Sequence, residues 1–266
     1  MWTSTALASE HRAYRDKVWR LVEGQHRIST NRLASDGATQ SLLEDLAEEV
    51  KPTVPESARH LHFLLATPFR YGHNRASRFR RADERPGIFY AAEAESTAIA
   101  ETAYWSLRFF SRSPGFTPPT TTVEYTSFHV RVATDRALDL TQHPFAEREA
   151  DWTAPDDYTA CQALATEARF AGTALIRTLS ARAEGRSCNI VVFDPQAFEN
   201  AEPVMHRTWH FRHQGERLSV LGAFPSLERH EFLAGQFGLR TTGNGTSLPY
   251  SATTANAWLY RKQPSS

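Results

Sequence analysis

A run of cations interleaved with aromatic rings, FRYGHNRASRFRR, is the first feature of the sequence that could do chemistry. Its charged and ring-bearing members include Arg70, Tyr71, His73, Arg75, Arg78, Arg80 and Arg81. The planar guanidinium group matches phosphate oxygens and keeps its charge at any relevant pH. Alternation with rings suits a ligand that carries phosphates and flat rings, such as a nucleotide or single-stranded nucleic acid. A solvated basic loop is the alternative interpretation.

The remaining composition restricts how this stretch can be explained. The 266-residue chain has a formal net charge of zero, which argues against a protein whose main task is coating nucleic acid or an anionic membrane. Neither GxxxxGK[ST] nor GxGxxG after a strand occurs, so the common phosphate-cradling loops are absent. The arginine-rich stretch therefore needs a local explanation.

Two other side chains are candidates for a catalytic role. Glu101 lies early in an expected helix over residues 97–110, among small or apolar neighbours that would let it face a cleft. Ser180, in RTLSARAEGRSCNIVVF, comes just before an expected core strand, where loop residues often line a site. The alternatives are a solvated carboxylate and a turn serine. No GxSxG surrounds Ser180, which argues against a serine hydrolase.

A metal site is not expected. His206, His210 and His213 fall in a region expected to be extended, and their spacing does not fit one face of a strand. Cys161 and Cys188 are the only cysteines, so the sequence has neither a disulfide framework nor a CxxC zinc site. We expect both thiols to be reduced and the chain to be cytoplasmic.

The elements expected to position these groups are mixed α and β from about residue 60. GIFYAA is expected to be a strand, followed by the helix over 97–110 with Ser96 as its N-cap. Strands are further expected for TVEYTSFHVRV, ALDLT and SCNIVVFDP, and a helix for residues 158–171. MHRTWHFRH and RLSVLGAF predict a late hairpin around Gln214 and Gly215.

The chain from about Glu10 to Val50 is predicted to be helical. Two apolar stripes support this, one formed by Tyr14, Val18, Leu21 and Val22 and the other by Leu42, Leu43 and Leu46. The domain prediction is an N-terminal helical extension over 1–57, a catalytic domain over 58–235 and a weakly ordered tail over 236–266. No stretch approaches twenty apolar residues, so neither a secretion signal nor a membrane span is expected.

The order of three motifs resembles a known family. FRYG…SRF, then GIFYAAEAESTAIAETAYW, then TLSAR followed by CNIVVFDP is similar to the RES-domain family, named for its Arg, Glu and Ser. The resemblance covers about residues 15–225 and is to the longer branch, whose N-terminal helical region resembles VWRLVEGQHRISTNRL. It implies an α+β fold like that of the ADP-ribosyltransferase toxins, a mixed split sheet with flanking helices around an NAD cleft.

The resemblance also implies a function. Known RES proteins are bacterial toxins that consume NAD+ by hydrolysis or phosphorolysis and are silenced by a cognate antitoxin. NAD+ would be a substrate rather than a cofactor, inorganic phosphate a possible co-substrate, and nucleic acid a partner only through an antitoxin; a homo-oligomer stays open. Two alternatives are kept: ADP-ribosyl transfer to a macromolecule, and a non-enzymatic module that binds single-stranded nucleic acid.

Motif by motif, the resemblance assigns roles to individual residues. It implies catalytic roles for Glu101, Arg78 and Ser180, and substrate binding by Arg70, Tyr71, Tyr90 and Arg78. The arginines would hold the pyrophosphate of NAD+, a tyrosine would pack against a flat ring, and the glutamate would stabilise a cationic transition state. The serine would hydrogen-bond the substrate or the incoming water or phosphate.

This sequence departs from the family pattern in two places. Gly72-His73 replaces the prolines that commonly follow the RY pair, and RTLSAR lacks the aromatic residue of the usual YPSVR. The first departure bears on the mouth of the pocket and the second on the placement of Ser180. Three further arginines, Arg80, Arg81 and Arg85, have no assigned role and are expected to be solvated or to face an antitoxin.

Overall fold

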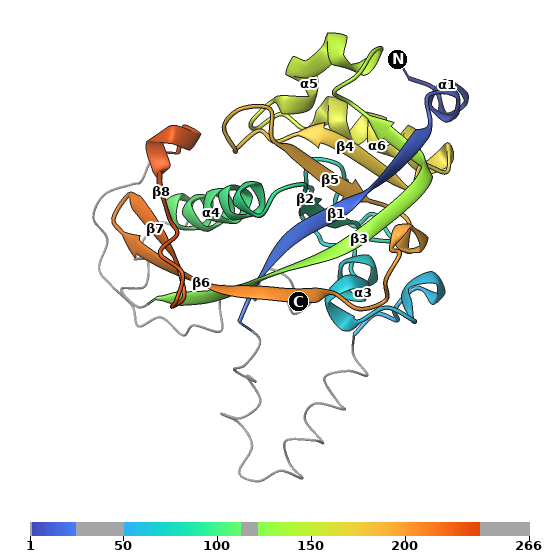
Figure 1. The fold of residues 1–266 in the computed structure, drawn as a ribbon. Helices are drawn as coiled ribbons and strands as arrows, with labels where there is room; N and C mark the ends of the chain where they lie inside the picture. Colours follow the sequence, from blue (N-terminus) through green and yellow to red (C-terminus); the bar gives the residue numbers. More distant parts are fainter. Residues whose placement is uncertain (1, 25–50, 113–121, 240–266) are drawn as a thin grey trace, which may run out of the picture. The chain divides into compact units, whose positions relative to one another are not determined.

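The structure is a computed structural model that describes residues 2–24, 51–112 and 122–239 (Figure 1). The helices are α1 (Ser4–Ser9), α3 (Phe63–Arg70), α4 (Glu95–Ser111), α5 (Glu149–Thr153) and α6 (Thr159–Phe170). The strands are β1 (Arg12–Glu23), β2 (Phe89–Ala92), β3 (Val123–Asp139), β4 (Leu175–Leu179), β5 (Cys188–Val192), β6 (Val204–Gln214), β7 (Arg217–Gly222) and β8 (Arg229–Leu233).

The chain forms two compact units, each assembled from separate stretches of sequence. Unit 1 comprises Met1–Leu21, Val54–Trp105 and Ser127–Arg207, and unit 2 comprises Val22–Thr53, Ser106–Thr126 and Thr208–Ser266. The boundaries expected at residues 57 and 235 remain predictions. No helix of the described residues is long and apolar enough to cross a bilayer.

Unit 1 is built on a mixed sheet. Its strands are hydrogen-bonded in the order β1-β2-β5-β4-β3, and β1 also pairs with β3. Strand β3 runs parallel to β4, through the pairing of Ala137–Asp139 with Leu175–Arg177, whereas β5 is antiparallel to both β2 and β4. With helices packed against it, this sheet confirms the mixed α+β fold that the sequence predicts.

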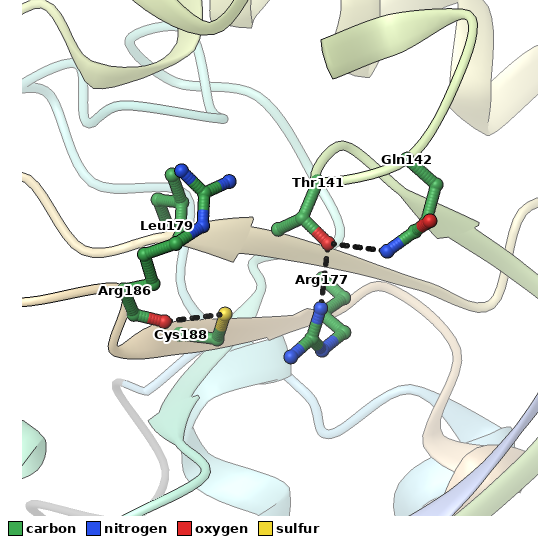
Figure 2. A pocket seen from close by; sticks show the side chains of 6 residues that line it. All are labelled: Thr141, Gln142, Arg177, Leu179, Arg186 and Cys188. Carbon is green, nitrogen blue, oxygen red and sulfur yellow. Dashed lines mark hydrogen bonds between the residues drawn. The ribbon is translucent and has the colours of Figure 1, made fainter.

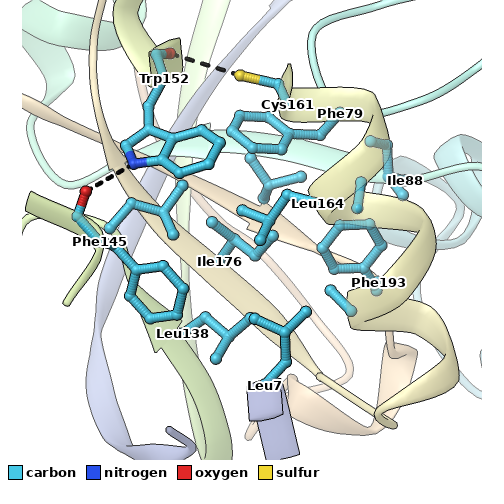
Figure 3. Packing of buried hydrophobic residues seen from close by; sticks show 14 residues of the cluster. Leu7, Phe79, Ile88, Leu138, Phe145, Trp152, Cys161, Leu164, Ile176 and Phe193 are labelled. Atoms are coloured by element: carbon cyan, nitrogen blue, oxygen red, sulfur yellow. Dashed lines mark hydrogen bonds between the residues drawn. The ribbon is translucent and has the colours of Figure 1, made fainter. Parts of the chain in front are cut away.

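The hydrophobic core of unit 1 covers one face of β4 and β5 (Figure 3). Ile176 of β4 lies directly opposite Val191 of β5, and both belong to a buried cluster that includes Leu164 of α6 and Trp152 of α5. Because side chains alternate between the faces of a strand, Thr178 and Asn189 form the next pair along the same face. The face thus changes from apolar to polar toward the end of β4.

Unit 2 contains the predicted hairpin. Strands β6 and β7 pair antiparallel with Gln214 opposite Arg217, and the two-residue turn has Gly215 at φ 61°. A positive φ at this position suits the tight turns that join twisted strands, and glycine adopts it without strain. Strand β8, which the sequence pattern did not predict, adds to β7.

The prediction of helix near the N-terminus is wrong for residues 12–23, which form strand β1. Tyr14, Val18 and Val22 are four residues apart, a spacing that fits one face of a helix but is also a multiple of two, so it equally fits one face of a strand. Pairing with β2, where Trp19 lies opposite Ala92, decides in favour of the strand. The second predicted stripe, Leu42 to Leu46, lies outside the described residues.

The local predictions from residue 87 onward are confirmed with small changes. Strand β2, helix α4, helix α6 and strand β5 fall within two residues of their expected positions. The two strands expected at 122–132 and 137–141 are joined in one long strand, β3. Strand β4, which immediately precedes Ser180, was not predicted.

His213, in unit 2, gives the fold a dependence on pH. The side chain is buried, its Nε2 lies 2.8 Å from Ser106 Oγ, and its ring packs edge-on against Phe110. Burial lowers the pKa of His213 to about 4. The unfolded chain binds this proton near the ordinary pKa of 6.5, so His213 contributes stability that is complete above pH 6.5 and is lost as the pH falls toward 4.

We predict that His213→Gln flattens the acid limb of the stability curve. The titration of this one group changes the free energy of unfolding by roughly 3 kcal/mol between pH 6.5 and 4. Chemical denaturation at a series of pH values measures the slope. The exposed His143 provides a control, because His143→Gln should leave the curve unchanged. An unaltered slope in His213→Gln would contradict the assignment.

Candidate active site

The Glu101 carboxylate is the centre of a polar cluster in unit 1. Ser180 donates a hydrogen bond from Oγ to Glu101 Oε1 over 2.6 Å, and Asn189 donates to the same oxygen from Nδ2 over 2.5 Å. Both donors are nine-tenths buried or more. Glu101 Oε2 has no hydrogen-bond partner in the part of the chain that the structure describes. The carboxylate is therefore fixed through one oxygen, and the other remains available.

The local backbone explains why Ser180 is at this position. It follows the last residue of β4, and its amide donates to Ser187 O over 2.7 Å, which closes the loop between β4 and β5. Its hydroxyl oxygen accepts the amides of Arg182 at 3.1 Å and Ala183 at 3.0 Å. With one bond donated and two accepted, the Ser180 hydroxyl has its full complement of hydrogen bonds.

Asn189 was missed by sequence reasoning, because it lies within the apolar run CNIVVF. All residues of strand β5 are buried, on either face of the sheet, and Asn189 is the one with an amide side chain. Its Nδ2 binds Glu101, while its Oδ1 is buried and has no hydrogen-bond partner among the described residues. An unpaired buried acceptor is costly, so this oxygen marks a place where a ligand donor would be stabilising.

Arg78 contacts Thr178, the strand partner of Asn189. Its Nη2 donates to Thr178 Oγ1 at 3.3 Å, to Leu179 O at 2.9 Å and to Trp152 O. Its Nε is buried without a partner in the described part of the chain. Arg78 thus holds the end of β4 through one terminal nitrogen and leaves Nε for another acceptor.

Tyr90 anchors the segment that carries Arg78. Its hydroxyl lies 2.8 Å from Ser77 Oγ and accepts the Phe79 amide over 3.0 Å, and the Phe79 ring is fully buried in the core. Burial raises the pKa of Tyr90 to about 12, so the hydroxyl stays protonated at neutral pH. Through these hydrogen bonds Tyr90 positions the residues on both sides of Arg78. The substrate-binding role that the family resemblance implies for Tyr90 stays a prediction.

Arg80 corrects an expectation. It was expected to be solvated or to face a partner, yet it is 4% exposed. Its guanidinium donates to the carbonyls of His73 at 2.9 Å, Arg81 at 3.0 Å and Arg75 at 2.6 Å. Arg80 therefore holds an irregular loop together by satisfying backbone acceptors that no strand or helix partners. Arg81 and Arg85 are exposed, as expected.

Arg70 and Tyr71 lie at the end of helix α3. The Arg70 guanidinium lies over the Tyr71 ring at 5.9 Å, and the Tyr71 ring stacks against His73 at 6.0 Å. Gly87 packs so closely under this segment that a Cβ there would be 2.0 Å from Pro68 O. These contacts position the pair relative to the start of β2. Their contact with a substrate remains a prediction.

Arg182 was also missed; it lies on the loop between β4 and β5 that begins with Ser180, here called the Ser180 loop. The Arg182 guanidinium stacks over the ring of Tyr104 at 3.6 Å and also donates to Pro155 O. Tyr104 lies one helical turn after Glu101 on α4, so this contact joins the loop to the same helix. The Ser180 loop is therefore attached to α4 twice, through Glu101 and through Tyr104.

The described residues contain no cluster of metal ligands. Nowhere in residues 2–24, 51–112 and 122–239 do three or more potential His, Cys, Asp or Glu ligands gather around a common point. The histidines considered at first are engaged elsewhere: His206 pairs with Glu95 at 3.2 Å, and His213 contacts Ser106. Both cysteines are free and buried.

We predict that Arg80→Lys destabilises the protein, because a lysine cannot reach three carbonyls with a planar fork. The loss should be about 2 kcal/mol in the free energy of unfolding, since several buried acceptors lose a charged donor. Urea denaturation measures it. Arg75→Lys, an exposed position in the same loop, is the control and should change stability little. Equal stability of the two variants would contradict the role of Arg80.

Similarity to known proteins identifies the family of the chain. The sequence model described as "RES domain" matches residues 54–213, and no curated protein matches. Among solved structures, the chain is similar to a chain in the crystal structure of the M. tuberculosis MbcT–MbcA toxin–antitoxin complex. The sequence identity is 15%, the TM-score is 0.44, and the match covers 78% of this chain and 90% of that chain. Because the family match spans more than half of its residues, the chain belongs to the RES domain family.

Proposed function

We propose that this protein degrades NAD+ by cleaving the bond between nicotinamide and ribose, and that it is the toxin of a toxin–antitoxin pair. The observation that carries the proposal is the Glu101 carboxylate, fixed through Oε1 by Ser180 and Asn189 with Oε2 available. Membership of the RES family supports it, because known members of that family consume NAD+ and are silenced by an antitoxin.

The chemistry fits a fixed carboxylate. In NAD+ the pyridine nitrogen is already cationic, so the C1′–N bond breaks with its electron pair moving to nitrogen and neutral nicotinamide leaving. No general acid is needed. The ribose carbon becomes cationic, like an oxocarbenium ion, and an anion held in place stabilises it without having to reorganise. Water or phosphate then adds to C1′ and loses a proton, giving ADP-ribose or its 1-phosphate.

Neighbouring groups supply binding contacts for the same substrate. Asn189 Oδ1, buried and unpaired, would accept a hydrogen bond from a ribose hydroxyl beside Glu101. Arg78 would offer its buried Nε to a pyrophosphate oxygen while Nη2 stays on the backbone. Holding the two ends of the reacting half of NAD+ lowers the entropic cost of reaching the reactive geometry.

The contacts of Ser180 refine the role implied by the family resemblance. Its hydroxyl already donates to Glu101 and accepts two backbone amides. A direct bond to substrate, water or phosphate would have to displace one of these. We therefore assign Ser180 as a positioning residue that sets the orientation of Glu101 and closes the loop after β4.

The arrangement gives little support to a module that binds single-stranded nucleic acid. Such proteins present a continuous row of cations and exposed rings to the strand. Here Arg80 is buried, and Arg78 is tied to backbone carbonyls of β4 and α5. Two of the cations in the arginine-rich stretch thus face inward.

The direct test is nicotinamide release from NAD+ by the purified full-length chain, free of any co-purified partner, with and without inorganic phosphate. The mass of the ribose-containing product identifies the acceptor. ADP-ribose under both conditions means hydrolysis, and phosphate-dependent ADP-ribose 1-phosphate means phosphorolysis. ADP-ribose attached to an added protein or nucleic acid would favour the transferase alternative. Absence of nicotinamide release from folded protein would overturn the proposal.

We predict that Glu101→Gln keeps the fold and lowers kcat by about 10²–10³-fold, because the substitution removes the charge but keeps the shape. Nicotinamide release under single-turnover conditions measures this, and a thermal melt checks the fold. The exposed Glu147, changed to Gln, serves as the control and should turn over NAD+ normally. Near-normal turnover by Glu101→Gln would remove Glu101 from the reaction centre.

We predict that Ser180→Ala separates kcat from KM. Because the hydroxyl acts on Glu101 rather than on substrate, kcat should fall by about 10- to 100-fold while KM changes little. The readout is a full saturation curve in NAD+. A large rise in KM with unchanged kcat would instead show that Ser180 binds the substrate directly.

A further inference from the structure

A second polar site lies at the carboxyl ends of strands β3 and β4, in unit 1. It is a pocket of about 230 Å³ lined by Thr141, Gln142, Arg177, Leu179, Arg186 and Cys188 (Figure 2). Thr141 and Gln142 follow β3, and Arg186 and Cys188 mark the end of the loop that leads into β5. Since β3 and β4 are parallel, their carboxyl ends meet at one edge of the sheet.

This pocket and the Glu101 cluster lie on opposite faces of the sheet. Leu179 pairs with Cys188, and Thr178 pairs with Asn189. Adjacent residues of a strand point to opposite faces, so the Leu179–Cys188 pair faces the pocket and the Thr178–Asn189 pair faces Glu101. A molecule in the pocket is therefore not in the proposed NAD+ site.

The residues lining the pocket are rich in hydrogen-bond donors. They include two guanidinium groups, an amide and a hydroxyl. The Thr141 hydroxyl is already engaged, because it donates to Asp139 Oδ1 over 2.7 Å and accepts Arg177 Nη1 at 2.7 Å. Gln142 uses one N–H of its amide on the same oxygen, at 3.4 Å, and keeps the other (Figure 2). Two carboxylates fix the Arg177 guanidinium. Its Nε and Nη2 donate to Glu93 at 2.6 and 3.0 Å, and its Nη1 donates to Asp139 at 3.3 Å. These carboxylates raise the pKa of Arg177 further above its ordinary value, so it stays charged.

Arg186 is the residue of this pocket whose side chain can change its partner. It pairs with Glu149 at 3.0 Å, but both side chains are largely open to solvent, with 66% and 42% exposed. Such exposed pairs contribute little free energy and exchange readily. Arg186 can therefore turn to an anion in the pocket, where Arg177 offers one further N–H on Nη2 and Gln142 offers its amide.

We propose that this pocket binds a phosphate group, either free inorganic phosphate or the phosphate of a monoester. Donors from three side chains, Arg177, Gln142 and Arg186, suit a tetrahedral oxyanion with several acceptor oxygens better than a carboxylate with two. The volume is below the range of about 300–1,000 Å³ that holds drug-sized ligands, which limits the occupant to a small group.

Isothermal titration calorimetry with inorganic phosphate, on the full chain without NAD+, tests the proposal. Saturable binding by the wild type is expected, weakened by about tenfold or more in Arg186→Gln and in Arg177→Lys, which loses the fork. Arg131→Gln is the matched control, because Arg131 forms an exposed pair with Glu199 outside the pocket. No binding by the wild type, or equal binding by Arg186→Gln and Arg131→Gln, would overturn the proposal.

Two further arms identify the bound species and the site. Ribose 5-phosphate and inorganic phosphate are titrated in parallel, and the compound that binds more tightly shows whether the site takes a monoester or free phosphate. Acetate at equal concentration is expected not to bind. Glu101→Gln should bind phosphate like the wild type, whether or not the protein degrades NAD+. Clearly tighter phosphate binding in Glu101→Gln, where a repelling charge has been removed, would place the anion at the Glu101 cluster and refute the pocket.

Discussion

One buried set of hydrogen bonds, centred on a carboxylate, joins helix α4 to the end of strand β4 and to strand β5. Glu101 is held through a single oxygen by two neutral donors, Ser180 and Asn189, which keep its charge in place without neutralising it. An arginine in their position would fix the carboxylate more strongly but would cancel the charge that a cationic transition state needs. Helix α4 and the β4–β5 pair must therefore stay in register, and the contact of Arg182 with Tyr104 supports the same alignment.

In the arginine-rich stretch, Arg78 and Arg80 mainly bind backbone carbonyls, and Arg78 also keeps a donor for a ligand. The chain from Tyr71 to Ile88 has few regular backbone partners, so its carbonyls need donors. Arg80 satisfies three of them, and Arg78 satisfies the carbonyls at the end of β4 and in α5. A neutral protein gathers cations here because guanidinium groups can bind several backbone oxygens at once, and Arg78 still keeps a buried Nε for a ligand.

Sequence reasoning succeeded where local patterns decide and failed where distant contacts do. Helix α4 follows from periodicity, and strand β5 follows from its run of apolar, β-branched residues. Motif order singled out Glu101 and Ser180, which are hydrogen-bonded to each other; their catalytic roles stay predictions. Asn189 could not be found this way, because it lies in an apolar run and its partner is 88 residues away. The burial of Arg80 was missed since arginine is rarely buried unless paired, and strand β1 was missed since a four-residue spacing also fits a strand.

A crystal structure of the Glu101→Gln variant with NAD+ bound tests the central claim most directly. The substitution keeps the shape of the site and slows turnover, so intact substrate should be visible. The account predicts that the nicotinamide ribose lies against residue 101 and Asn189, with the pyrophosphate at Arg78, on the face opposite Arg177. NAD+ bound on the Arg177 face, or with its ribose away from residue 101, would contradict the claim that the Glu101 carboxylate is the reaction centre.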